Sequence, residues 1–242
     1  MKVGITGEYG FIGTNLRKML DSSDHVVSTP NSFDGYRYFI EKNDVIVHLA
    51  GVNRGSHDEM METNVNMTLK IADLCYKHKK KLIYMGSKYN KKDSYALTKQ
   101  ISSKAILSYV SNFNCNFFVI EPPLVVGEGC IPFYNSFITT MVYQHANGDL
   151  SYRDKIENYD SRIEFVWVDD LCETICNLID DENAEPSAYN FIHTKNYISS
   201  LSEIIEMLEG KAPKSDPAKI RYQDQIPDFK KFQKLLEHYR DT

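Results

Sequence analysis

A tyrosine and a lysine four residues apart are the side chains of this sequence best suited to chemistry. Tyr95 and Lys99 occur in the segment SYALTK. On a helix, this spacing places both side chains on one face, about one turn apart. An ammonium group in that position can lower the pKa of the phenol and also reach a cofactor bound above it. The pair therefore predicts a proton donor beside a hydride donor.

A serine hydroxyl completes this predicted centre. Ser87 ends the apolar segment LIYMGS, which is predicted to be a strand. In a doubly wound sheet, the carboxyl end of a strand is where ligands bind, so this hydroxyl can donate to a substrate carbonyl. A free tyrosine has a pKa near 10, and acting close to neutrality needs a shift of roughly 3 units, or about 4 kcal/mol. We expect Lys99 and the nicotinium charge to supply that shift to Tyr95.

Three glycines near the start of the chain predict a dinucleotide site. Gly7, Gly10 and Gly13 follow an apolar strand and precede a helix, in the segment GEYGFIG. In this context a glycine turn lets the backbone approach a pyrophosphate at a helix N-terminus. The candidate cofactor contacts are Gly7, Tyr9, Gly10, Phe11, Ile12, Ser28, Thr29, Arg37, Leu49, Ala50, Gly51, Asn64, Tyr95, Lys99 and Pro122.

Two questions remain open about these candidates. Asn64 is polar on an otherwise apolar helix face, so it either contacts the cofactor or bridges backbone groups. At the end of the second strand, an acid would bind the ribose 2′-hydroxyl, whereas a neutral or basic residue tolerates a 2′-phosphate. Here Ser28 and Thr29 are neutral, Asp34 lies further on, and Arg37 is a candidate phosphate ligand. NADP(H) is favoured over NAD(H).

The alternation of apolar and amphipathic segments predicts an α/β fold with a doubly wound parallel sheet of the Rossmann type. The predicted strands and helices of the first half are residues 2–6, 15–20, 25–28, 44–49, 59–78, 81–86, 95–110 and 116–120. Glycines and prolines loosen the pattern after residue 123, before a strand at 163–168 and a helix from Asp169. We expect a dinucleotide-binding core over residues 1–125, with 160–182 returning to it. Residues 126–159 and 183–242 are expected to form a smaller substrate-binding lobe.

Composition narrows the class of protein. The net charge of −5 argues against nucleic acid as the main partner, because phosphate backbones are bound through concentrated Lys and Arg. The five cysteines contain no CxxC pair, and the chain opens without a signal peptide pattern, so we expect reduced thiols in a cytoplasmic protein. No apolar stretch approaches the roughly 18 residues of a membrane helix. The seven histidines show no metal-ligand spacing, so no metal is predicted.

The motifs together resemble the extended short-chain dehydrogenase/reductase family over essentially the whole chain. The resemblance rests on TGxxGFIG at the start, HLAG at 48–51, Asn-Val at 64–65, Ser87, YxxxK and Val-Asp-Asp at 168–170. Within the family, HLAGVNR, GEGCIPFYNS and the short interval from Ser87 to Tyr95 resemble the reductase domain of capsular-polysaccharide enzymes. Those enzymes make UDP-2-acetamido-2,6-dideoxy-L-hexoses.

The resemblance implies that Ser87, Tyr95 and Lys99 are the catalytic triad. The implied substrate is a UDP-linked 4-keto-6-deoxy-hexose or N-acetylhexosamine, reduced at C4 by NADPH, with Tyr95 protonating the new alkoxide. The implied substrate contacts are Asn53, Arg54, Ser87, Tyr134, Asn135 and Arg162. A surface ion pair with Asp160 or Glu164 is an equal alternative for Arg162. The family also implies a homodimer, formed through helices that begin near residues 57 and 94.

Two departures from the family pattern bear on substrate. Glu121 stands where the family usually has arginine, and the chain ends without the C-terminal cupin domain of the related capsular enzyme. We therefore expect a separate dehydratase and 3,5-epimerase upstream. Two alternatives remain open. One is a nucleotide-sugar epimerase or dehydratase that retains NAD, although no acid pair follows Ser87. The other is a regulatory protein that senses dinucleotide without turnover.

Overall fold

Five short apolar segments form an all-parallel sheet, as the sequence predicts. They are β1 (Lys2–Thr6), β2 (Val26–Ser28), β3 (Val45–His48), β4 (Lys81–Met85) and β5 (Phe117–Ile120). Their order in the sheet is β2-β1-β3-β4-β5, and every neighbouring pair is parallel. The strand order reverses between β1 and β3, which makes the carboxyl ends of these two strands the expected ligand crevice. The predicted doubly wound α/β fold is confirmed.

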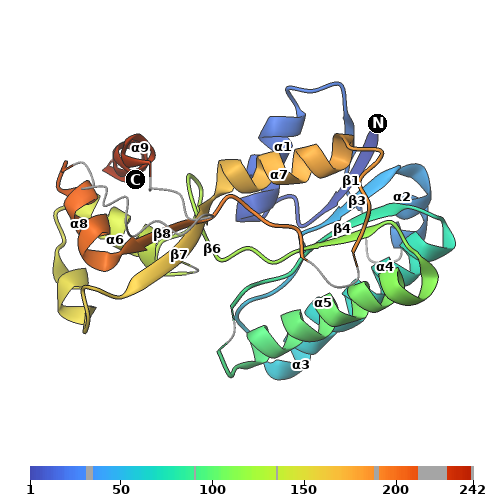
Figure 1. Ribbon diagram of the computed structural model, residues 1–242, viewed down its shortest axis with the longest axis horizontal. Helices are drawn as coiled ribbons and strands as arrows, with labels where there is room; N and C mark the ends of the chain where they lie inside the picture. The colour runs from blue at the N-terminus through green and yellow to red at the C-terminus, as the bar shows by residue number, and fades with distance from the viewer. Residues whose placement is uncertain (31–34, 90, 135, 188–190, 212–227, 241–242) are drawn as a thin grey trace. The chain divides into compact units, whose positions relative to one another are not determined.

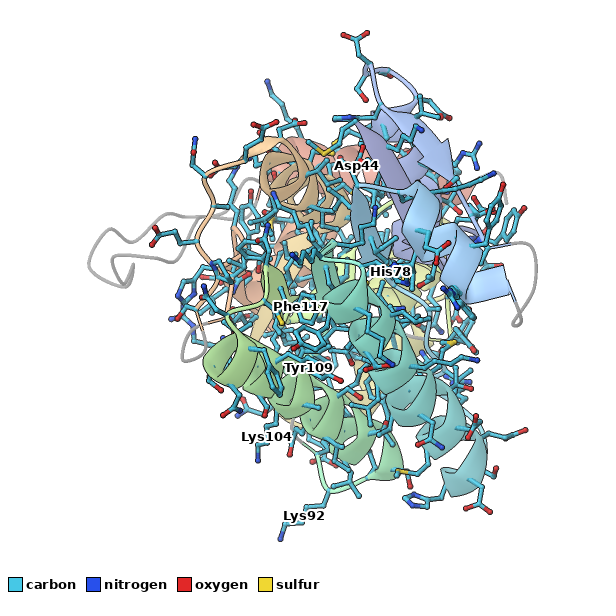
Figure 2. All side chains as sticks on the ribbon, turned by 90° about the vertical axis from the view of Figure 1, so that its right-hand side faces the viewer. Asp44, His78, Lys92, Lys104, Tyr109 and Phe117 are labelled. Atoms are coloured by element: carbon cyan, nitrogen blue, oxygen red, sulfur yellow. The ribbon has the colours of Figure 1, made fainter. Side chains whose placement is uncertain are left out.

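Helices cover both faces of this sheet (Figure 1). The computed structural model describes residues 1–30, 35–89, 91–134, 136–187, 191–211 and 228–240. Helices α1 (Phe11–Leu20) and α7 (Val168–Asp180) lie on one face, and α2 (Tyr36–Lys42), α4 (Met67–Lys77) and α5 (Ser94–Phe113) pack on the other. Figure 2 turns α4 and α5 toward the reader, side by side. Large apolar side chains such as Ile71, Leu82 and Ile106 are fully buried between these helices and the sheet.

The predicted helix over 59–78 is longer and less regular than its periodicity indicates. It begins as α3 (His57–Met60), where Ser56 and Glu59 form a capping box. It then widens into a π-helical segment, η2 (Met61–Asn66), before continuing as α4. The periodic pattern of apolar residues is the same in all three segments, so the sequence does not reveal the π-helical turn.

A second unit has its own three-stranded sheet and core. Strand β6 (Leu124–Val126) pairs parallel with β7 (Arg162–Trp167), which pairs antiparallel with β8 (Tyr197–Ser200). Helices α6 (Phe137–Ala146), α8 (Leu201–Leu208) and α9 (Phe229–Arg240) and the 3₁₀ segment η3 (Ser151–Lys155) complete it. Its core includes Phe165, Trp167 and Phe232, whose rings meet edge to face at 5.0–5.9 Å. We did not predict α2, α6 or β8, because they are short or follow a stretch rich in glycine and proline.

The chain divides into residues 1–122 with 169–194, and residues 123–168 with 195–242. This division differs from the predicted boundaries in three places: residues 123–125 and 160–168 lie in the second unit, and residues 183–194 lie in the first. Strand β7 belongs to the second unit because its partners are β6 and β8. Residues 183–194 join the first unit, where Ile192 forms a parallel bridge with Ile120. That the second unit binds substrate stays a prediction.

Candidate active site

The glycine turn packs against the end of β3 so closely that side chains are excluded. Gly7 has φ +76°, and a Cβ there would lie 2.6 Å from the backbone nitrogen of Ala50. A Cβ on Gly13 would lie 2.2 Å from the carbonyl oxygen of Gly7. Gly10 is the N-cap of α1 and provides no side-chain hydrogen bond, so first-turn N–H groups remain for an anion. This cradle fits the pyrophosphate of a dinucleotide at the crevice between β1 and β3.

A carboxylate inside the glycine turn is neutralised, which the sequence reasoning missed. Glu8 is only 6% exposed, and its Oε2 lies 2.8 Å from Nη1 of Arg17 on α1. Its neighbour Tyr9 is 93% exposed, while Phe11 and Ile12 are half-buried at the start of the helix. The Glu8–Arg17 pair keeps a negative charge from acting alone against the phosphates of a bound dinucleotide. Its signal in the sequence is an acid and an arginine nine residues apart across the turn.

The structure brings the three predicted catalytic residues together at the carboxyl end of β4. Ser87 lies two residues beyond β4, and Tyr95 and Lys99 lie in the first turns of α5. Asp93 caps this helix by accepting a hydrogen bond from the N–H of Ala96 at 2.9 Å. The cap fixes where α5 begins, and therefore where the phenol of Tyr95 stands relative to Ser87.

Burial sets the protonation of this centre. It raises the pKa of Tyr95, and a hydrogen bond with Ser87 opposes the rise. Burial also lowers the pKa of Lys99 to about 8, and its Nζ donates to the carbonyl oxygen of Met85 at 2.8 Å. Burial is the largest effect on the phenol of Tyr95, and a lowering of its pKa by Lys99 together with a nicotinium charge stays a prediction. Tyr95 is therefore protonated at neutral pH, which is the form that donates a proton.

Tyr89 is a further residue of this centre that sequence reasoning missed. Its backbone N–H donates to Oγ of Ser87 at 3.2 Å, and its ring lies 5.9 Å from the ring of Tyr95. Burial and a hydrogen bond with Asp93 raise the pKa of its phenol. The hydroxyl group of Ser87 thus accepts from Tyr89 and is also hydrogen-bonded with Tyr95. Its signal in the sequence is an aromatic residue in the short interval between Ser87 and Tyr95.

The side chain of Asn64 bridges backbone groups. This is the second of the two roles predicted for it, the first being contact with the cofactor. Its Oδ1 accepts from the N–H of Val52 at 2.8 Å, and its Nδ2 donates to the carbonyl of Val52 at 2.8 Å and to Oγ1 of Thr98 at 3.1 Å. Both amide hydrogens are thus engaged within the protein. A Cβ on Gly51 would lie 3.0 Å from Oδ1 of Asn64 and 3.4 Å from Nζ of Lys99. Asn64 therefore fixes the loop that follows β3, where Leu49, Ala50 and Gly51 lie.

The residues predicted to select the dinucleotide are partly engaged elsewhere. Ser28 donates from Oγ to Oδ1 of Asn43 at 2.9 Å, and Thr29 is half-buried beyond it. Arg37 pairs through Nε with Oε1 of Glu41 at 2.8 Å, one turn along α2. Asp34 lies outside the described residues. The buried Pro122 accepts the N–H of Lys88 at its carbonyl, 3.0 Å away, and so ties the Ser87 loop to the end of β5.

The predicted substrate contacts fall in both units. Asn53, Arg54 and Ser87 belong to the first unit, where Arg54 is exposed in the loop after β3. Tyr134 and Arg162 belong to the second unit, and both are exposed. Asn135 lies outside the described residues.

Glu121 lies against the backbone of the strand that carries Ser87. A Cβ on Gly86 would lie 2.9 Å from Cγ of Glu121 and 2.7 Å from Oγ of Ser103 on α5. Burial raises the pKa of this half-buried carboxyl group. The residue therefore packs on the α5 side of the sheet, and a side chain at position 86 would have to displace Glu121 and Ser103.

The residues that the structure describes contain neither a metal-ligand cluster nor a membrane-spanning helix. Among residues 1–30, 35–89, 91–134, 136–187, 191–211 and 228–240, no three His, Cys, Asp or Glu side chains gather as a metal site would require. No helix within the same ranges has the length and apolar character needed to cross a membrane.

The fold is that of a Rossmann-type α/β protein, and its glycine turn and Tyr-Lys pair form a candidate active site. The chain belongs to the NAD dependent epimerase/dehydratase family, whose model matches residues 3–191. It is similar to the capsular polysaccharide assembling protein CapF from Staphylococcus aureus, with 25% identity and a TM-score of 0.66. That match covers 86% of this chain but only 56% of the CapF chain. No curated protein matches the chain.

Two further solved structures share the fold over nearly the whole of both chains. MoeE5 in complex with UDP-glucose and NAD is 15% identical, with a TM-score of 0.75 over 100% of this chain and 99% of that one. RMD from Pseudomonas aeruginosa, complexed with NADPH, is 14% identical, with a TM-score of 0.74 over 99% of each chain. Neighbours of this fold thus bind either nicotinamide dinucleotide.

Proposed function

We propose that the protein is an NADPH-dependent reductase of a nucleotide-linked 4-keto-6-deoxy-hexose or N-acetylhexosamine, acting at C4. The observation that carries the proposal is the centre at the end of β4, where Ser87, Tyr95 and Lys99 converge beside the glycine cradle. Tyr95 retains its proton there, and Lys99 is anchored 2.8 Å from the carbonyl of Met85. A protonated phenol is what reduction of a ketone requires.

Each side chain has a part in this reduction. Bound NADPH would supply the hydride to C4. Ser87 donates its hydroxyl hydrogen to the C4 oxygen, and Tyr95 gives a proton to the same oxygen as negative charge develops on it. Lys99, with its pKa lowered to about 8, is mostly charged at neutral pH and stabilises the phenolate that remains. The sugar leaves as the C4 alcohol, and Tyr95 regains its proton from solvent.

The residues around the centre support reduction over dehydration. Lys88 and Tyr89 follow Ser87, whereas a dehydratase generally has a pair of acids beside its tyrosine. The similarity to CapF supports a polysaccharide sugar as substrate. Because the chain spans 56% of CapF, the sugar and its nucleotide, with UDP preferred, are part of the proposal.

NADPH is proposed over NADH because the described residues at the end of β2 are neutral. Ser28, Thr29 and Pro30 present no carboxylate that would repel a 2′-phosphate. Arg37 on α2 is mostly exposed, so its guanidinium can exchange Glu41 for a phosphate.

A homodimer through α3, α4 and α5 is also proposed, and it rests on the family resemblance. Tyr76 on α4 and Phe113 on α5 are exposed aromatic residues whose rings lie 5.1 Å apart. Tyr109 joins them on the face that Figure 2 shows. Light scattering on the purified protein tests the proposal, and a mass of one chain would reject it.

The test of function is loss of NADPH absorbance with a UDP-4-keto-6-deoxy-N-acetylhexosamine, generated by a dehydratase with and without a 3,5-epimerase. Native protein is compared with Tyr95→Phe, which keeps the ring and removes the proton. Rapid oxidation that Tyr95→Phe abolishes supports the reductase and identifies the accepted epimer. Absence of oxidation with both sugars contradicts it. Tightly retained NAD together with a change of sugar configuration would then indicate the epimerase, and cofactor binding without turnover the sensor.

A further inference from the structure

A buried histidine lies between the end of β1, beside the glycine turn, and α4, which packs against the helix of Tyr95 and Lys99. His48, the last residue of β3, is 0% exposed. Its Nδ1 lies 2.6 Å from Oγ1 of Thr6, at the end of β1, and its Nε2 lies 2.9 Å from Oγ1 of Thr68, on α4. Both ring nitrogens are therefore in hydrogen bonds with hydroxyl groups that come from different elements.

The hydroxyl of Thr68 indicates a direction for each hydrogen bond in this series. Thr68 donates its hydroxyl hydrogen to the carbonyl of Asn64 at 2.7 Å, so its oxygen accepts from the Nε2–H of His48. The Nδ1 atom then has no hydrogen and accepts from the hydroxyl of Thr6. The oxygen of Thr6 accepts in turn from the N–H of Ala50 at 3.3 Å. Burial, with a smaller effect of Lys99, lowers the pKa of His48 to about 3, so the ring stays neutral.

One end of this series of hydrogen bonds reaches the loop at Ala50, and the other end reaches α5, the helix that carries Tyr95 and Lys99. Ala50 lies in the loop that packs on Gly7, 2.6 Å from where a Cβ on Gly7 would be. At the far end, the carbonyl of Asn64 also accepts the hydroxyl of Ser102 on α5 at 2.7 Å. The side chain of Asn64 bonds Thr98, which lies between Tyr95 and Lys99. The π-helical turn η2 supplies this junction, since Asn64 is part of it.

We infer that His48 is a positioning residue that, as the neutral Nε2–H tautomer, couples the backbone beside the cofactor to the helix carrying Tyr95 and Lys99. Its side toward Thr6 holds the loop of Ala50 against the glycine turn. Its side toward Thr68 holds Asn64, and through it α5. The consequence for turnover rests on the proposed function, whereas the tautomer and the effect on cofactor binding do not.

The tautomer is tested first, on the native full-length protein labelled with ¹⁵N-histidine. Ring nitrogens with and without hydrogen have well-separated ¹⁵N shifts, and His48→Gln assigns the signal. We expect one ring with a hydrogen on Nε2 only, unchanged from pH 5 to pH 9. A hydrogen on Nδ1, or titration within this range, would overturn the inference.

Two substitutions then separate the two sides of the ring. The amide of His48→Gln reaches the position of Nε2 and keeps the bond to Thr68, while that of His48→Asn reaches the position of Nδ1 and keeps the bond to Thr6. We expect His48→Gln to weaken NADPH binding about tenfold and largely keep kcat, and His48→Asn to lower kcat about tenfold and largely keep NADPH binding, as loss of one hydrogen bond allows. Thr68→Val should behave like His48→Asn, and Thr68→Ser, which keeps the hydroxyl, like native protein.

A core substitution provides the control for stability alone. Val110→Ala, near the end of α5, removes buried volume away from the hydrogen-bonded chain. If the His48 variants lose thermal stability to the same extent as Val110→Ala and show its kinetics and NADPH affinity, the residue has a structural role only and the inference fails. If no sugar is reduced by native protein, the proposed function fails. The ¹⁵N shifts and NADPH titrations still decide the positioning role.

Discussion

The positive charge of Lys99 stabilises a phenolate on Tyr95 in the proposed reaction, but burying this charge lowers the free energy of unfolding. The cost to the fold can be measured as a dependence of stability on pH. The side chain is 5% exposed, and burial lowers its pKa from the ordinary 10.5 to about 8. A shift of about 2.5 units corresponds to about 3 kcal/mol. Below pH 8 both the folded and the unfolded chain carry the charge, so this cost is present in full. Between pH 8 and 10.5 the unfolded state binds more protons, so stability rises with pH.

Replacing the lysine with methionine removes this titration. The Lys99→Met variant keeps a side chain of similar length, but it leaves the carbonyl of Met85 without its donor at a cost of about 1–3 kcal/mol. That cost does not depend on pH. We therefore expect the free energy of unfolding of native protein, relative to the variant, to increase by about 3 kcal/mol from pH 7 to pH 10.5.

The assay is urea unfolding followed by circular dichroism at the two pH values, on cofactor-free protein. Lys104→Met, an exposed lysine on the same helix (Figure 2), is the matched control and should change stability by less than about 0.5 kcal/mol at either pH. An equal difference between native protein and Lys99→Met at both pH values would refute the reasoning. The lysine would then not be desolvated in the folded state.

Three further predictions test the site. Gly13→Ala places a Cβ 2.2 Å from the backbone oxygen of Gly7, so we expect loss of folding or of NADPH binding. Gly10→Ala, whose Cβ would lie 3.2 Å from the same oxygen, should keep the fold. Thermal melting and fluorescence titration with NADPH check both variants. Tyr89→Ala should lower kcat about tenfold, because Tyr95 loses the ring that packs against it. Tyr89→Phe keeps this ring contact and should lower kcat less than about threefold. Steady-state kinetics measure both, and equal losses of kcat would show that the ring contact does not position Tyr95. Arg37→Ala should weaken NADPH about tenfold and leave NADH unchanged; parallel changes in the two dissociation constants would remove Arg37 from the phosphate site.

The parts of the site that follow from local sequence could be predicted. The glycine turn and the pair Tyr95 and Lys99 depend on the spacing of residues within one or two elements. Because these elements are regular strands and helices, residue spacing in the sequence determines where the side chains lie. The alternation of apolar and amphipathic segments in the first half predicted the parallel sheet for the same reason.

The parts that depend on contacts between distant residues could not be predicted. The bond from Lys99 to Met85, which sets where the ammonium points, joins residues 14 apart. The chain through His48 links three elements, and His48 in the sequence is only a polar residue at the end of an apolar strand. The partners of β7 are fixed by a second core whose residues are spread over 124–239. The burial that raises the pKa of Tyr95 likewise depends on three-dimensional packing.

Transfer of deuterium from [4-²H]NADPH to the sugar is the measurement that tests the central claim most directly. If the centre of Ser87, Tyr95 and Lys99 performs a net reduction, the product carries deuterium at C4, one equivalent of NADPH is consumed per sugar, and Tyr95→Phe forms no labelled product. Conversion of the sugar without deuterium at C4 and without consumption of NADPH would contradict the claim. The hydride would then have cycled within a retained cofactor, as in an epimerase.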